Sequence, residues 1–103
     1  MNWQQQSIEF AQKQNLSHPP SVYVLDLISE VGEVAKEILL ATDYGERPFQ
    51  PQPALTGELG DVLYSLCLLA TAVNIDLNEA LTITLQKYAS RQQAKGHIGS
   101  SSS

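Results

Sequence analysis

Apolar residues recur at helical spacing in four stretches of the chain, and turn-forming residues separate these stretches. The second stretch predicts a helix over residues 21–41. We expect one of its faces to turn toward the core. That face consists of Val24, Leu27, Ile28, Val31, Ala35 and Ile38. The other stretches predict helices over residues 4–14, over residues 54–73, and from the turn at 74–76 to about residue 95. The pattern predicts an all-α protein built as a four-helix bundle.

Proline, aspartate and glycine mark the predicted helix ends. Pro19 and Pro20 cannot continue the first helix, whereas Pro53 suits the first turn of the third. Asp76, with Glu79 three residues later, resembles a capping box at the start of the fourth helix. We expect the fourth helix to stop at glycine 96. Residues 1–96 therefore predict a single helical domain, and residues 97–103 predict a flexible tail.

The second half of the third predicted helix is apolar on nearly all sides, which is typical of a central helix. Its apolar run is too short to predict a membrane span. Cys67 lies within this run and is the only cysteine, so a buried thiol is a better expectation than a nucleophile. A chain without an internal disulfide and with no visible signal peptide suits a reducing cytosol. We therefore expect a cytoplasmic protein with no membrane partner.

The chain has 11 acidic and 6 basic residues, for a formal net charge of −5. Binding to a nucleic-acid backbone requires a basic surface, so nucleic acid is not an expected partner. A small phosphorylated ligand stays compatible with this charge if bound cations mediate the contact.

Two pairs of acids, each spaced by three residues, carry the candidate chemistry: Glu30 with Glu33, and Glu58 with Asp61. Both pairs have nearly the same angular offset from the apolar face of their helix, so antiparallel packing would make them converge. Clustered carboxylates repel one another, and a hard divalent cation would offset that repulsion. The pairs therefore predict a magnesium site. The alternative is a pair of solvated helix faces.

Each pair encloses a glycine, Gly32 or Gly60, in the interior of a helix. Close approach of two helices is the favoured interpretation, and room for a ligand is the alternative. On the fourth predicted helix, Lys87 and Arg91 are four residues apart and share a face. They are either solvent-exposed helix charges or cations that hold substrate phosphates.

With these residues in place, the sequence resembles the MazG-like branch of the all-α nucleoside triphosphate pyrophosphohydrolases. The family signature is E-x-x-E, a spacer, and then E-x-x-D. Here Glu30 and Glu33 are followed, after 24 residues, by Glu58 and Asp61. The segments LISEVGEVAKEIL and GELGDVLYSLCLLA are similar to the two motif helices, and NIDLNEAL is similar to the turn into the last helix.

The resemblance implies hydrolysis of a nucleoside triphosphate, ribo or deoxy, to the monophosphate and pyrophosphate, as in house-cleaning of the nucleotide pool. It implies Mg²⁺, with Mn²⁺ as the alternative, held by four catalytic residues. These are Glu30, Glu33, Glu58 and Asp61. Lys87 and Arg91 would bind substrate phosphates. A homodimer or homotetramer is the assembly that the resemblance implies, and dimerisation would complete the bundle.

Two positions depart from the family pattern. Ser29 stands where many relatives have a further glutamate, so Glu37 is a conceivable substitute base. Tyr88 stands where many have asparagine, which leaves base and ribose recognition open. Two alternatives to the enzyme therefore stay open: a helical module that binds a nucleotide without hydrolysing it, and a purely structural helical oligomer.

Overall fold

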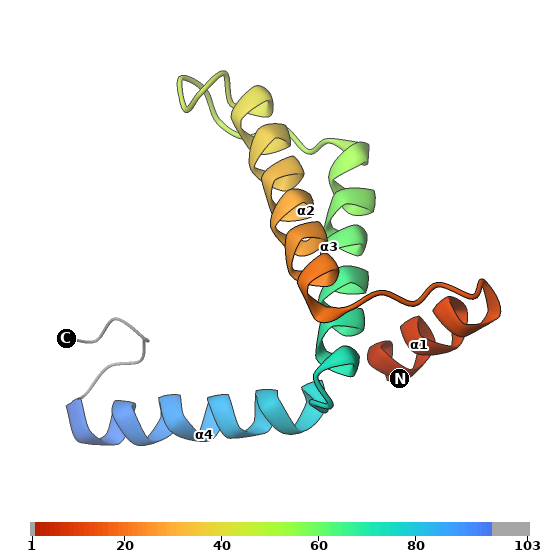
Figure 1. Ribbon diagram of the computed structural model, residues 1–103. Coiled ribbons are helices and arrows are strands. Elements are labelled where there is room, and N and C mark those ends of the chain that lie inside the picture. The colour runs from red at the N-terminus through yellow and green to blue at the C-terminus, as the bar shows by residue number, and fades with distance from the viewer. Residues whose placement is uncertain (1, 96–103) are drawn as a thin grey trace.

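The computed structural model describes residues 2–95, which form four helices and no strand (Figure 1). The helices are α1 (Trp3–Lys13), α2 (Pro20–Ala41), α3 (Pro53–Ala72) and α4 (Leu77–Lys95). Each predicted helix is present, with ends within one or two residues of those expected. The all-α, four-helix prediction is confirmed. The predicted stop at glycine 96 and the tail over 97–103 lie outside the described residues.

Helix α3 is central. Helix α2 runs antiparallel beside it, and α1 packs against its C-terminal half (Figure 1). Phe10 of α1 meets Tyr64 of α3 edge to face, with ring centroids 6.0 Å apart. Cys67 is fully buried, as expected for a small apolar side chain in a core. Helix α3 is apolar nearly all round because it contacts α1 on one side and α2 on another.

Local chemistry accounts for the helix ends. Asn2 caps α1 by accepting a hydrogen bond from the backbone N–H of Gln5 at 2.9 Å. Pro20 and Pro53 occupy the first positions of α2 and α3, where a missing N–H costs nothing. At the start of α4, Asp76 accepts from the N–H of Asn78 at 2.8 Å, and also from the N–H of Glu79. The predicted capping role of Asp76 is confirmed.

The side-chain amide of Gln4 joins α1 to the turn between α3 and α4. Its Nε2 donates to Thr71 Oγ1 at 3.1 Å and to the carbonyl oxygen of Ile75 at 2.8 Å. Its Oε1 accepts from the backbone N–H of Leu77 at 2.8 Å. In the same turn Asn74 has a φ of 60°, a left-handed conformation that asparagine tolerates better than most residues. These contacts fix the direction in which α4 leaves α3.

That direction leads away from the rest of the chain, so one copy does not close the bundle. Figure 1 shows α4 leaving the lower end of α3 and pointing away from α2. Three of its apolar residues are more than half exposed: Leu81 at 56%, Ile83 at 58% and Leu85 at 56%. An isolated helix of this length is marginally stable in water, because most helical stability in proteins comes from tertiary packing.

The apolar face predicted to turn α2 toward the core is also largely in solvent. Val24, Ile28 and Val31 are 39%, 62% and 49% exposed. Helix α2 instead turns an adjacent stripe toward α3, which includes buried Tyr23 and Ala41 and half-buried Glu30 and Glu37. The expectation that this apolar face covers the core is therefore wrong within one chain. Helix α3 contacts α2 at the edge of the apolar face, where the acids lie.

Helix α3 is 20 residues long and, by length and composition alone, apolar enough to cross a membrane. The stretch that qualifies includes residues 57–61 and is therefore longer than the apolar run of residues 62–73 on which the expectation was based. Length and composition are weak evidence, since the core helix of a soluble protein passes the same test. Only 17% of this stretch is buried within one chain, although α3 carries Glu58 and Asp61 and packs against both α1 and α2.

Two tyrosines at the α1–α2–α3 junction predict opposite effects of losing a hydroxyl. The hydroxyl of Tyr23 accepts a hydrogen bond from the N–H of His18 at 3.0 Å, whereas the buried hydroxyl of Tyr64 has no partner. Tyr23→Phe should lower the free energy of unfolding by about 1 kcal/mol, and Tyr64→Phe should leave it unchanged or raise it. Urea unfolding of both variants measures this. A larger loss for Tyr64→Phe would contradict the assignment.

Candidate metal and nucleotide site

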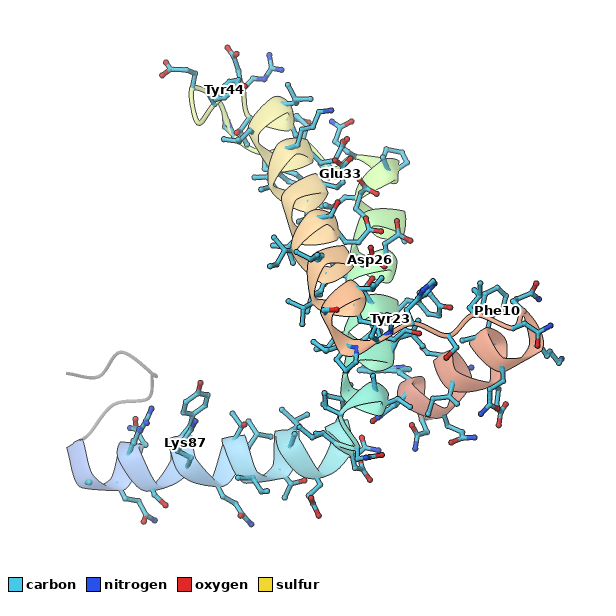
Figure 2. The ribbon with its side chains drawn as sticks, viewed as in Figure 1. Phe10, Tyr23, Asp26, Glu33, Tyr44 and Lys87 are labelled. Carbon is cyan, nitrogen blue, oxygen red and sulfur yellow. The ribbon has the colours of Figure 1, made fainter. Side chains whose placement is uncertain are left out.

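The acids of α2 and α3 meet along the interface of these two antiparallel helices. On α2 they form one stripe, and Figure 2 shows Asp26 and Glu33 on the side of α2 that faces α3. Glu58 and Asp61 lie in the first half of α3, opposite the second half of α2. The structure therefore brings the two sequence-predicted pairs to the same region of the interface.

The electrostatics of Glu58 demonstrate this convergence. Partial burial raises the pKa of its carboxyl above the usual 4.5, and the negative charges of nearby acids raise that pKa further. These acids are, in order of effect, Glu33, Asp61, Glu30 and Glu37. Three of the four lie on α2, so the repulsion acts across the helix interface.

The chemistry of these side chains fits a hard divalent cation, which prefers carboxylate oxygens. Their positions are looser than a ligand set. Within residues 2–95, no three carboxylate, imidazole or thiol groups come close enough to hold one ion together. A cation between the helices would have to draw the carboxylates inward, and its charge would offset their mutual repulsion. The backbone therefore brings the predicted residues into one region, but contacts between their side chains do not hold them in place.

The two glycines beside the acids have open surroundings. A methyl group added at Gly32 or at Gly60 would meet no atom within 4 Å. The favoured interpretation of these glycines, close approach of two helices, is therefore wrong within one chain. The alternative, room for a ligand or for a second chain beside the acids, is compatible with this open space.

The predicted phosphate-binding pair lies apart from the acids in one chain. Figure 2 shows Lys87 on the extended α4, far from Glu33 on α2. Tyr88 lies between the two cations: Lys87 Nζ is 5.4 Å from its ring centroid, and the Arg91 guanidinium carbon is 5.8 Å from it. Lys87 and Arg91 therefore lie close to each other but not to the carboxylates.

A further cation near the acids was not predicted. Arg47, in the loop after α2, lines a small cavity of about 140 Å³ together with Glu37 and Gln52. Glu37 is half-buried at the end of the acid stripe, so the conceivable substitute for the glutamate missing at Ser29 belongs to the cluster. Periodicity could not indicate Arg47, because the residue lies in an irregular loop whose path depends on tertiary contacts.

Comparison with known proteins identifies the class to which this fold and site belong, the nucleotide pyrophosphohydrolases. The MazG nucleotide pyrophosphohydrolase domain matches residues 19–95, and the chain belongs to this family. Over 77 residues it is 32% identical to the uncharacterized protein YpjD of Bacillus subtilis (strain 168), over 72% of this chain and 68% of that protein.

A solved structure supports the same assignment. The chain is similar to the crystal structure of the Bacillus-conserved MazG protein, described as a nucleotide pyrophosphohydrolase. The TM-score is 0.67 and the sequence identity 28%, over 82% of this chain and 83% of that one. The all-α fold and the MazG-like hydrolase class are therefore established.

The raised pKa of Glu58 predicts that the metal-free protein loses stability as the pH rises. The folded state holds this proton more tightly than the unfolded state, so the stabilising effect is complete below the usual pKa of 4.5 and is lost as the pH rises through the folded pKa. Glu58→Gln should flatten this slope. Thermal unfolding in EDTA from about pH 4 to about pH 8 measures it. Equal slopes for the two proteins would contradict the prediction.

The open space at the two glycines gives a second test. Gly32→Ala and Gly60→Ala should each raise the free energy of unfolding of the metal-free monomer by about 1 kcal/mol, because alanine favours a helix and nothing in the chain obstructs its methyl group. Denaturant unfolding at low protein concentration checks this. A loss of stability in either variant would mean that another group occupies the space.

Proposed function

We propose that this protein is a Mg²⁺-dependent nucleoside triphosphate pyrophosphohydrolase, which cleaves a ribo- or deoxyribonucleoside triphosphate to the monophosphate and pyrophosphate. The observation that carries the proposal is the coupling of Glu58 to carboxylates on both helices of the interface. Like charges that repel one another around a half-buried carboxylate such as Glu58 are costly unless a cation neutralises them. Membership of the MazG family supports a nucleotide as the ligand that such a cation would bind.

In this proposal Glu30, Glu33, Glu58 and Asp61 are the catalytic residues and hold Mg²⁺, with Mn²⁺ as a possible substitute. The bound ion neutralises phosphate charge and lowers the pKa of water. The four carboxylates come from two packed helices, and with the ion they would orient the reacting phosphate groups. Glu37, at the end of the stripe, is the proposed base for this water.

Lys87 and Arg91 are proposed to bind the substrate phosphates, and a homodimer or homotetramer is the proposed assembly. The large apolar side chains left in solvent on α2 and α4 support self-association. The formal net charge of −5 disfavours nucleic acid, and we propose a cytoplasmic location with no membrane partner.

Ser29 favours a second candidate, a nucleotide-binding protein with little hydrolytic activity. It is exposed on α2 beside Glu30, and its neutral hydroxyl brings neither the negative charge nor the basicity of a carboxylate. This candidate predicts that triphosphates raise the unfolding temperature in Mg²⁺ without any release of product.

Assays of pyrophosphate release over a panel of nucleoside triphosphates test the proposed enzyme. With Mg²⁺, at least one triphosphate should give equal amounts of monophosphate and pyrophosphate, and EDTA should abolish the reaction. Glu33→Gln and Asp61→Asn should each lower kcat by about 100-fold or more, because each removes a ligand charge. Glu9→Gln on α1 is the matched control and should keep full activity. No turnover of any triphosphate would refute the proposal.

A further inference from the structure

The acid cluster between α2 and α3 has a cation at one end and aromatic rings at the other. The cluster consists of Glu30, Glu33, Glu37, Glu58 and Asp61. Arg47 lies in the loop that follows α2, whereas the edge-to-face pair of Phe10 and Tyr64 lies toward α1. Figure 2 shows Tyr44 of this loop and Phe10 on opposite sides of Glu33. The two ends of the cluster therefore differ in their chemistry.

A compact turn fixes the backbone of the loop that carries Arg47. The Thr42 hydroxyl donates to the carbonyl oxygen of Ile38 at 2.8 Å and accepts from the N–H of Gly45 at 3.1 Å. The N–H of Arg47 then donates to the carbonyl oxygen of Thr42 at 3.0 Å. These hydrogen bonds bring the chain back to the C-terminal end of α2, so Arg47 lies close to the last acid of that helix.

The cavity beside Arg47 continues the acidic interface. Its volume is about 140 Å³, and its lining includes Glu37 and Gln52. Along the helices, Glu37 lies about 6 Å beyond Glu33, and Gln52, the N-cap of α3, lies about 9 Å before Glu58. One water molecule needs only about 10–15 Å³ of such volume. The cavity therefore has room for a larger group, at a distance that the end of a triphosphate chain held at the acids can reach.

The guanidinium group of Arg47 suits a phosphate group in this cavity. It is always charged and presents five N–H donors in a planar fork, which can bind two phosphate oxygens at once. Within residues 2–95 it forms no ion pair, although Glu37 lines the same cavity. Lys87 lies far from the acids in one chain (Figure 2). Arg47 is therefore a cation that a single chain supplies at the end of its own acid cluster.

The aromatic end of the cluster determines the direction in which a nucleotide would lie. Tyr64 is about one helical turn beyond Asp61 along α3, and it lines an open cavity of about 370 Å³ together with Phe10. Phe10 is 53% exposed, and an exposed aromatic ring can stack on a nucleobase. Phosphate charges, in contrast, are costly to bring against an apolar surface. A nucleotide between the helices should therefore direct its base toward α1 and its phosphates toward Arg47.

We propose that Arg47 binds the terminal phosphate of the substrate triphosphate, in the cavity that it lines with Glu37 and Gln52. Arg47 would then distinguish triphosphates from shorter nucleotides and would hold the pyrophosphate product until its release. This inference rests on the proposed function for the identity of the ligand, but binding of pyrophosphate tests it without catalysis.

Calorimetric titration with inorganic pyrophosphate in Mg²⁺ tests this phosphate site directly. Arg47→Ala should weaken pyrophosphate binding by about 10-fold or more, because it removes a hydrogen-bonded pair of opposite charges. Arg47→Lys should fall between the two, because an ammonium group cannot form the planar fork. Lys13→Ala on α1 removes the same charge at an exposed position and should bind pyrophosphate as the wild type does.

The controls separate a phosphate contact from an effect on folding or on the metal. Arg47 is exposed in a loop, so its variants should keep the wild-type unfolding temperature and Mn²⁺ affinity. Unchanged pyrophosphate binding in Arg47→Ala would overturn the proposal. An equal loss of Mn²⁺ affinity in that variant, or no pyrophosphate binding by the wild type, would also overturn it.

Steady-state kinetics test the selection of triphosphates. In Arg47→Ala the KM for the best triphosphate should rise about 10-fold, and by more than kcat falls, because the terminal phosphate is bound both before and during the reaction. Inhibition by the diphosphate of the same nucleoside should not change, since its shorter chain does not reach Arg47. Equal losses for the two nucleotides would overturn the proposal. If the wild type hydrolyses no triphosphate, the proposed function fails while the pyrophosphate titration still decides the role of Arg47.

Discussion

The antiparallel contact between α2 and α3 is the constraint on which the structure depends, because it forces carboxylates of both helices into one interface. Apolar packing holds the helices together, and the acids repel one another across the same contact. Glu58 shows the conflict most clearly, since its pKa is raised by partial burial and by charges on both helices. Such repulsion lowers the stability of the fold, and the proposed cation would restore it.

The same constraint explains why one chain is incomplete. Because α2 turns its acidic edge toward α3, its broad apolar face is left in solvent, and α4 is directed away from it by the Gln4 contacts. A chain of 103 residues buries a limited core, so two uncovered apolar surfaces are a large fraction of what could stabilise it. The proposed self-association would cover both surfaces.

The helices and the convergence of the acids could be predicted from the sequence, because both depend on local signals. Prolines at 19, 20 and 53 and the cap at Asp76 set the helix ends, and the spacing of Glu30, Glu33, Glu58 and Asp61 set their faces. The direction of α4 could not be predicted. It depends on one amide side chain, Gln4, which contacts residues about seventy positions away. The open surroundings of Gly32 and Gly60 could not be predicted either, because open space beside a helix gives no periodic pattern in the sequence.

Direct measurement of metal binding tests the central claim that the acid cluster is a cation site. In an electron paramagnetic resonance titration, Mn²⁺ should lose its free signal as it binds, and excess Mg²⁺ should restore that signal. The double variant Glu33→Gln/Asp61→Asn should abolish binding, whereas Glu9→Gln should bind as the wild type does. Binding that persists unchanged in the double variant, or no binding by the wild type, would contradict the account.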